Sequence, residues 1–183
     1  MARVMKLAAL AAVVLTVVFA WLDWTPWMIT AGAFAYHLLM RLAVGGVFNL
    51  TMRNRVDYNH AWFQLRKPEQ ALYERLQVGR WKTSMPTYDP DAFDRHKHTW
   101  DEIAQAMCQA ELVHEVIVVL SFLPAAIALW RGEDQLVFLL TSLAAACYDM
   151  MFIMMQRYNR PRILNIVQRL RERTAGRSIQ TGK

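Results

Sequence analysis

The sequence contains few cysteines and few charged residues for its length. Two cysteines among 183 residues exclude a scaffold built on disulfides, which would need many more in so short a chain. Only 20% of the residues are charged, and 11 methionines with 7 tryptophans exclude a disordered chain. The apolar share of 55% is too large for the surface of a soluble domain. With these classes excluded, the composition indicates an integral membrane protein.

Four apolar runs are long enough to cross a bilayer as helices, at residues 7–22, 27–50, 112–130 and 136–156. Short polar turns at residues 23–26 and 131–135 join the first run to the second and the third to the fourth. The sequence therefore predicts an all-α integral membrane protein with four transmembrane helices in two hairpins.

The N-terminus also has features of a signal peptide, because Arg3 and Lys6 precede an apolar run and Ala33-Phe34-Ala35 resembles a cleavage site. That triplet lies inside the second apolar run, too far from the first for cleavage of a leader. We therefore expect the first run to be an uncleaved anchor.

The positions of the basic residues indicate how the chain is oriented. Of the 21 Lys and Arg residues, all but Arg41 and Arg131 lie in the N-terminus, the central stretch and the C-terminal tail. The positive-inside rule predicts that these parts, both termini included, are on the cytoplasmic side of the membrane. The net charge of +6 then reflects topology and membrane lipids, not nucleic acid.

The pattern divides the chain into a hairpin at 1–52, an interfacial segment at 53–110, a second hairpin at 111–173 and a disordered tail at 174–183. The central segment is too short to bury a core of its own. Helical spacing of apolar residues after Pro68 predicts an amphipathic helix on the membrane surface. We expect Asp91 or Asp94 to start the helix that runs into the third span.

Ionisable residues within the spans need partners or functions, because burying them in lipid is costly. With a rise of about 1.5 Å per residue, Arg41 and Asp149 reach depths that allow an ion pair. His37 lies deeper than His114, which excludes a haem held between these two residues. Cys108 and Cys147 are expected to be reduced, buried and apolar in character. We expect neither a metal site nor a cofactor.

Glu111 and His114 are three residues apart and therefore neighbours on one helix face. A carboxylate beside an imidazole fixes its tautomer, as a general base requires. The chain lacks the second Glu-x-x-His motif of a di-iron site. A pair that only solvates the entry of the helix remains an alternative.

The string from Gln156 to Arg162 is rich in hydrogen-bond donors, with three arginines, a glutamine, a tyrosine and an asparagine. Cations there complement the dipole of a helix C-terminus, and Pro161 is expected to end or kink the helix. A basic flank that follows the positive-inside rule is the alternative. The topology places this string at the same membrane face as Glu111 and His114.

Together with Glu111-Leu112-Val113-His114 and Trp81-Lys82 followed by Pro86, this string resembles the bacterial glycosyl-4,4'-diaponeurosporenoate acyltransferase family. The resemblance covers roughly residues 55–170. It implies a small membrane enzyme that esterifies the sugar of a glycosylated carotenoid with a fatty acyl chain, towards staphyloxanthin-type pigments.

The hypothesis is acyl transfer from a thioester donor to a hydroxyl of a glycosylated, lipid-like acceptor. His114, oriented by Glu111, acts as the general base, and the expected substrate-binding residues are Gln156, Arg157, Asn159, Arg160, Arg162, Trp81 and Lys82. A non-catalytic scaffold of a lipid- or pigment-synthesising complex is the first alternative. A small transporter using Arg41, His37 and Asp149 is the second.

Overall fold

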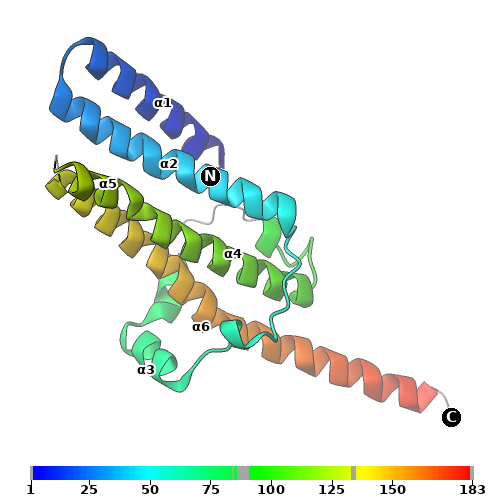
Figure 1. Ribbon diagram of the computed structural model, residues 1–183. Coiled ribbons are helices and arrows are strands. Elements are labelled where there is room, and N and C mark those ends of the chain that lie inside the picture. Colours follow the sequence, from blue (N-terminus) through cyan, green and yellow to red (C-terminus); the bar gives the residue numbers. More distant parts are fainter. Residues whose placement is uncertain (1, 84, 86–90, 133–134, 182–183) are drawn as a thin grey trace. The chain divides into compact units, whose positions relative to one another are not determined.

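The computed structural model describes residues 2–83, 85, 91–132 and 135–181, and all regular secondary structure within them is helical (Figure 1). Four helical stretches are long and apolar enough to cross a membrane, at Arg3–Trp21, Thr25–Thr51, Trp100–Arg131 and Gln135–Ala175. The predicted all-helical chain with four apolar helices is therefore confirmed.

The elements follow one another as α1 (Ala2–Trp21), α2 (Thr25–Thr51), η1 (Ala61–Phe63), α3 (Lys67–Arg75), η2 (Val78–Thr83), η3 (Asp91–Phe93), α4 (Trp100–Ser121), α5 (Leu123–Arg131) and α6 (Gln135–Thr181). They form two compact units. Unit 1 contains Met1–Arg53 and Leu112–Ile153, and unit 2 contains Asn54–Met85, Asp89–Glu111 and Met154–Lys183. The end of α6 thus packs with the central segment, whereas the sequence grouped it with the second hairpin.

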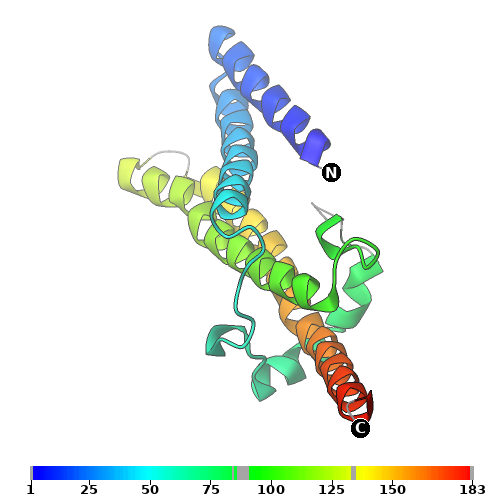
Figure 2. The same ribbon diagram turned by 90° about the vertical axis from the view of Figure 1, so that its right-hand side faces the viewer.

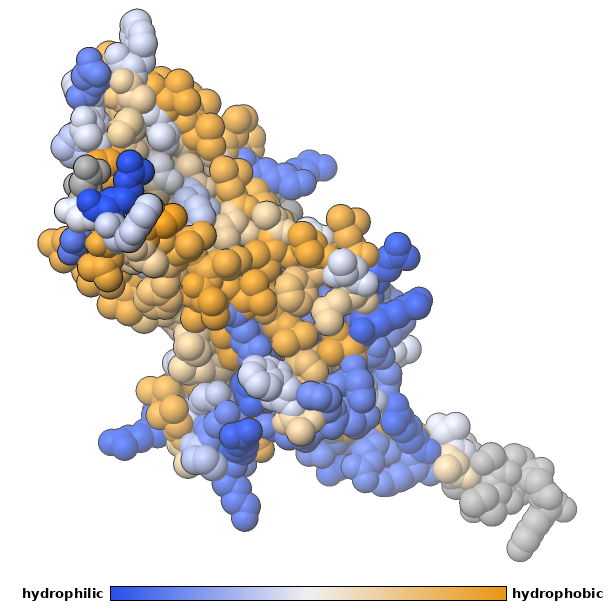
Figure 3. Space-filling view, in the orientation of Figure 1, coloured by the Kyte–Doolittle hydropathy of each residue, from blue (hydrophilic) through white to orange (hydrophobic). Residues whose placement is uncertain are grey.

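In unit 1, α1 and α2 lie side by side (Figures 1 and 2). A turn over Leu22–Trp24 joins them, and Asp23 adopts a positive φ of 55° there. Orange, apolar side chains gather over much of unit 1 in Figure 3, and many large apolar residues of α1 and α2 are exposed. Such apolar side chains suit contact with lipid. The backbone N–H and C=O groups find their hydrogen-bond partners within the helices.

The third predicted span is two helices, α4 and α5, that meet at Phe122. Pro124 lies in the first turn of α5 and has no N–H to donate to the carbonyl of Leu120, four residues earlier. The hydroxyl of Tyr36 on α2 donates to that carbonyl instead, at 2.8 Å. A backbone acceptor freed by proline within an apolar span is therefore satisfied by a neighbouring helix.

In unit 2, α4 begins at Trp100, and the prediction of a start at Asp91 or Asp94 is wrong. Thr99 and Glu102 form a capping box. The backbone N–H of Thr99 donates to Glu102 at 2.7 Å, and the N–H of Glu102 donates to the Thr99 hydroxyl at 3.2 Å. These two reciprocal bonds satisfy free N–H groups at the helix start, whereas Asp91 begins only the short η3.

Helix α6 continues through Pro161, so of the two predicted effects of this proline, an end or a kink of the helix, the end is wrong. A proline inside a helix costs about 3 kcal/mol, because it removes one backbone hydrogen bond and its ring crowds the preceding turn. The side chains of Arg157 and Arg160, in the turn that precedes Pro161, bond to other parts of unit 2 and hold the helix there. The backbone stays helical to Thr181, where the sequence predicted a disordered tail from residue 174. The segment after Pro161 is rich in good helix formers such as Leu, Arg and Gln.

Candidate active site

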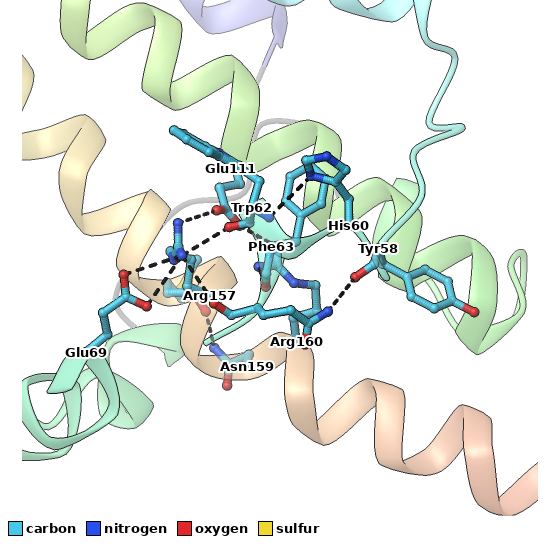
Figure 4. Close-up of polar contacts among 11 residues, drawn as sticks. Tyr58, His60, Trp62, Phe63, Glu69, Glu111, Arg157, Asn159 and Arg160 are labelled. Atoms are coloured by element: carbon cyan, nitrogen blue, oxygen red, sulfur yellow. Dashed lines mark hydrogen bonds and ion pairs between the residues drawn. The ribbon is translucent and has the colours of Figure 1, made fainter. Parts of the chain in front are cut away.

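Glu111 on α4 is the centre of a buried ionic cluster in unit 2 (Figure 4). Its Oε1 atom accepts a hydrogen bond from Arg157 Nη1 at 3.0 Å, and its Oε2 atom accepts one from Arg160 Nη1. The carboxylate is fully buried and Arg160 is only 1% exposed. One enclosed anion is therefore shared by two arginines that lie one turn apart on α6.

The same two arginines bind η1 and α3. Arg160 donates to the backbone carbonyl of Phe63, and its guanidinium lies 5.1 Å from the centre of the Phe63 ring. Arg157 donates to the carbonyl of Trp62 at 3.2 Å and to the Glu69 carboxylate at 3.4 Å. These partners were not predicted from the sequence. Backbone carbonyls leave no signal in a sequence, although Glu69 beside Pro68 marked the start of α3.

The formal charges of this cluster balance, with two carboxylates against two guanidinium groups. Tyr73 of α3 is buried beside it, and burial, followed by the charge of Glu69, raises the pKa of this phenol. Tyr73 therefore stays neutral at physiological pH. Glu111 and Arg160, predicted as a catalytic and a substrate-binding residue, are joined here in a buried pair that holds α4 and η1 to α6.

The other residues of the 156–162 string differ in exposure. Gln156 is buried, and the Asn159 side-chain amide donates to the Met155 carbonyl of its own helix at 2.9 Å. Arg162 is exposed, and its guanidinium lies 4.8 Å from the centre of the Tyr158 ring. Among the three predicted arginines, Arg162 is thus the one open to a ligand.

Trp81 and Lys82, the remaining residues predicted to bind substrate, lie in η2. The side chain of Trp81 is partly exposed. The side chain of Lys82 is outside the described residues, so its predicted role stays a prediction.

A second polar cluster lies within unit 1 and joins three helices. His114 Nδ1 on α4 is 2.8 Å from Asp149 Oδ1 on α6, and the other oxygen of Asp149 binds Arg41 of α2. The His114 ring stacks on Phe152, with centroids 4.6 Å apart and planes inclined by 5°. The predicted orientation of His114 by Glu111 is therefore corrected, because the carboxylate that contacts this imidazole is Asp149. Arg41 and Asp149 form an ion pair, as their predicted depths in the membrane allowed.

His37 and the two cysteines are the remaining candidate functional residues from the sequence. His37 is buried on α2, and its ring nitrogens have no hydrogen-bond partner among the described residues. Cys108 is a buried free thiol, but Cys147 is exposed, so its predicted burial is wrong because it lies on an outward face of α6. Among the described residues, no group of three or more His, Cys, Asp or Glu side chains is placed to hold a metal ion.

Comparison with known proteins identifies the family. The family model described as glycosyl-4,4'-diaponeurosporenoate acyltransferase matches residues 59–169 of the chain. This range contains Trp81, both Glu111 and His114, and the complete string from Gln156 to Arg162. No curated protein and no solved structure matches the chain at a significant level. Because the match spans more than half of the sequence, the chain belongs to the glycosyl-4,4'-diaponeurosporenoate acyltransferase family.

Proposed function

We propose that the protein transfers a fatty acyl group from a thioester to a hydroxyl of a glycosylated, lipid-like acceptor at the cytoplasmic face of a bacterial cell membrane. The family implies an acyltransferase in carotenoid biosynthesis. Four apolar helices give such a protein access to acyl chains and to a carotenoid or lipid acceptor within the bilayer. The observation that carries the proposal is an imidazole, His114, held in one orientation within the family's matched region.

In this reaction His114 accepts the proton of the acceptor hydroxyl while the hydroxyl oxygen attacks the thioester carbonyl carbon. A carbon–oxygen bond forms and the carbonyl oxygen becomes an oxyanion. The carbon–sulfur bond then breaks, and the leaving sulfur takes the proton from the imidazolium. The products are an ester and a free thiol, and His114 returns to its neutral form.

A general base needs a lone pair, which an imidazole has in its neutral form. Beside His114 in unit 1, Arg41 and Asp149 form an ion pair.

Arg162 is the first candidate for binding the acyl donor, because it is exposed and carries a fixed positive charge. An arginine binds phosphate oxygens with two parallel hydrogen bonds, and acyl thioesters of coenzyme A or of a carrier protein carry phosphates. We assign Gln156, Arg157, Asn159, Trp81 and Lys82 to the same substrate-binding set. Glu111 and Arg160 serve this set indirectly, since they hold α4 and η1 against α6.

Mass spectrometry of membrane lipids and pigments tests the proposal. Cells would produce the wild type, His114→Ala or Asp91→Asn at matched abundance, or no protein. Asp91→Asn is the control, because Asp91 pairs with Lys97 at an exposed site. A glycolipid heavier than its precursor by one fatty acyl group less water should appear only with the wild type and the control. Equal products in all four cultures would refute acyl transfer and favour a scaffold.

A further inference from the structure

The ionic cluster of unit 1 contains a carboxylate whose role the proposed reaction leaves open. Asp149 is 1% exposed and contacts His114 through one oxygen and Arg41 through the other. The side chains of His114 and Arg41 are 21% and 14% exposed, respectively. Three side chains from α2, α4 and α6 are thus held together within helices that are otherwise apolar.

The contact between His114 and Asp149 determines which imidazole nitrogen carries the proton. An ionised carboxylate can only accept hydrogen bonds, so the proton in the 2.8 Å contact is on His114 Nδ1. In a neutral imidazole the lone pair is then on Nε2. Nε2 is therefore the atom that would take the proton of an acceptor hydroxyl.

Two further contacts fix this arrangement. Arg41 binds the second oxygen of Asp149 and also donates to the carbonyl of Ala145 at 3.4 Å, one turn earlier on α6. Phe152 stacks on the imidazole and fixes the plane of the ring. The carboxylate and the ring are consequently held in place independently of each other.

Glu111 is engaged elsewhere and is not the residue that orients the His114 imidazole. Both of its oxygens accept hydrogen bonds from arginines in unit 2, which compete for its charge. The charged or titratable groups near His114 include Asp149 from α6, Arg41 and His37 from α2, and Glu111 and Glu115 on α4 itself. Asp149 contacts the imidazole at 2.8 Å.

We propose that Asp149 is a positioning residue that holds His114 in the Nδ1–H tautomer, and that Arg41 fixes Asp149 in turn. The proposal rests on the proposed function, because it assigns the orientation of the general base of that reaction. Without the carboxylate, the transfer rate should fall at least tenfold, and by no more than the roughly 100- to 10,000-fold that general base catalysis contributes.

The test uses the purified full chain in lipid nanodiscs and two forms of the perturbation. Asp149→Asn removes the charge but leaves Arg41 buried without its partner. The double variant Arg41→Met with Asp149→Leu removes both charges and keeps apolar volume, a replacement that is often neutral for stability. Asp91→Asn is the matched control. For each protein, the acyl-transfer rate is measured, and nitrogen-15 NMR of labelled histidine reports the tautomer of His114.

The wild type and the control should show His114 protonated on Nδ1 at a pH where the imidazole is neutral. The double variant should lose this preference and at least 90% of the transfer rate while its unfolding transition remains cooperative. A wild-type Nε2–H tautomer, or a double variant that keeps the wild-type rate, would overturn the positioning role. A wild type that transfers no acyl group, with the Nδ1–H tautomer present, would instead refute the proposed function.

Discussion

Replacing Glu111 by Gln should destabilise the protein by about 3 to 5 kcal/mol, the cost of breaking a buried ion pair by removing one partner. Glutamine keeps the size of the side chain but cannot neutralise the two guanidinium groups that now bind Glu111. Arg160 is 1% exposed, so water cannot take over the lost partner. The guanidinium groups left without a neutralising charge should weaken the packing of η1 and α3 against α6.

The free energy of unfolding can be measured by equilibrium denaturation of the purified chain in mixed micelles. Asp91→Asn is the matched control, because it removes the exposed pair with Lys97 and should change stability little. A double-mutant cycle with Arg160→Met isolates the interaction. Arg160→Met should cost less in the Glu111→Gln background than in the wild type. A loss for Glu111→Gln no larger than that of the control would refute the buried pair.

Three further predictions concern single residues. His114→Ala should lower the single-turnover rate of acyl transfer about 100- to 10,000-fold, and an unchanged rate would exclude a general base at this position. Arg162→Ala should raise the KM for an acyl-coenzyme A donor about tenfold or more, since a hydrogen bond to a charged group contributes about 1.5–3 kcal/mol, and steady-state kinetics would show this. Gly79→Ala should destabilise the chain by about 1 kcal/mol, because the added Cβ would lie 3.1 Å from Cε1 of Tyr158 and the ring has to shift to admit it. Denaturation of Gly79→Ala in a Tyr158→Leu background should show that loss relieved, and an equal loss would contradict the contact.

The apolar helices could be predicted from the sequence because their length and composition alone determine whether they suit a bilayer. The start of α4 was also within reach. Thr99 followed by Glu102 is the spacing of a capping box, a stronger local signal than the isolated Asp91 or Asp94.

The partner of His114 was beyond sequence reasoning. Glu111 is the carboxylate nearest to it along the helix, and local spacing favours that pair. The contact with Asp149 depends on the rotation of α4 and α6 about their axes, which two apolar sequences do not specify. Likewise, the arginines of α6 were recognised as a donor-rich cluster, but their acceptors include the backbone carbonyls of Trp62 and Phe63. Backbone acceptors have no residue signature.

The most direct test of the account is a balanced assay of the purified full chain in lipid vesicles. The substrates are glycosyl-4,4'-diaponeurosporenoate and an acyl-coenzyme A labelled in its acyl group. The account predicts one labelled ester for each free thiol released by the wild type, with both products lost in His114→Ala. Thiol release without ester, or equal ester formation by the two proteins, would contradict it.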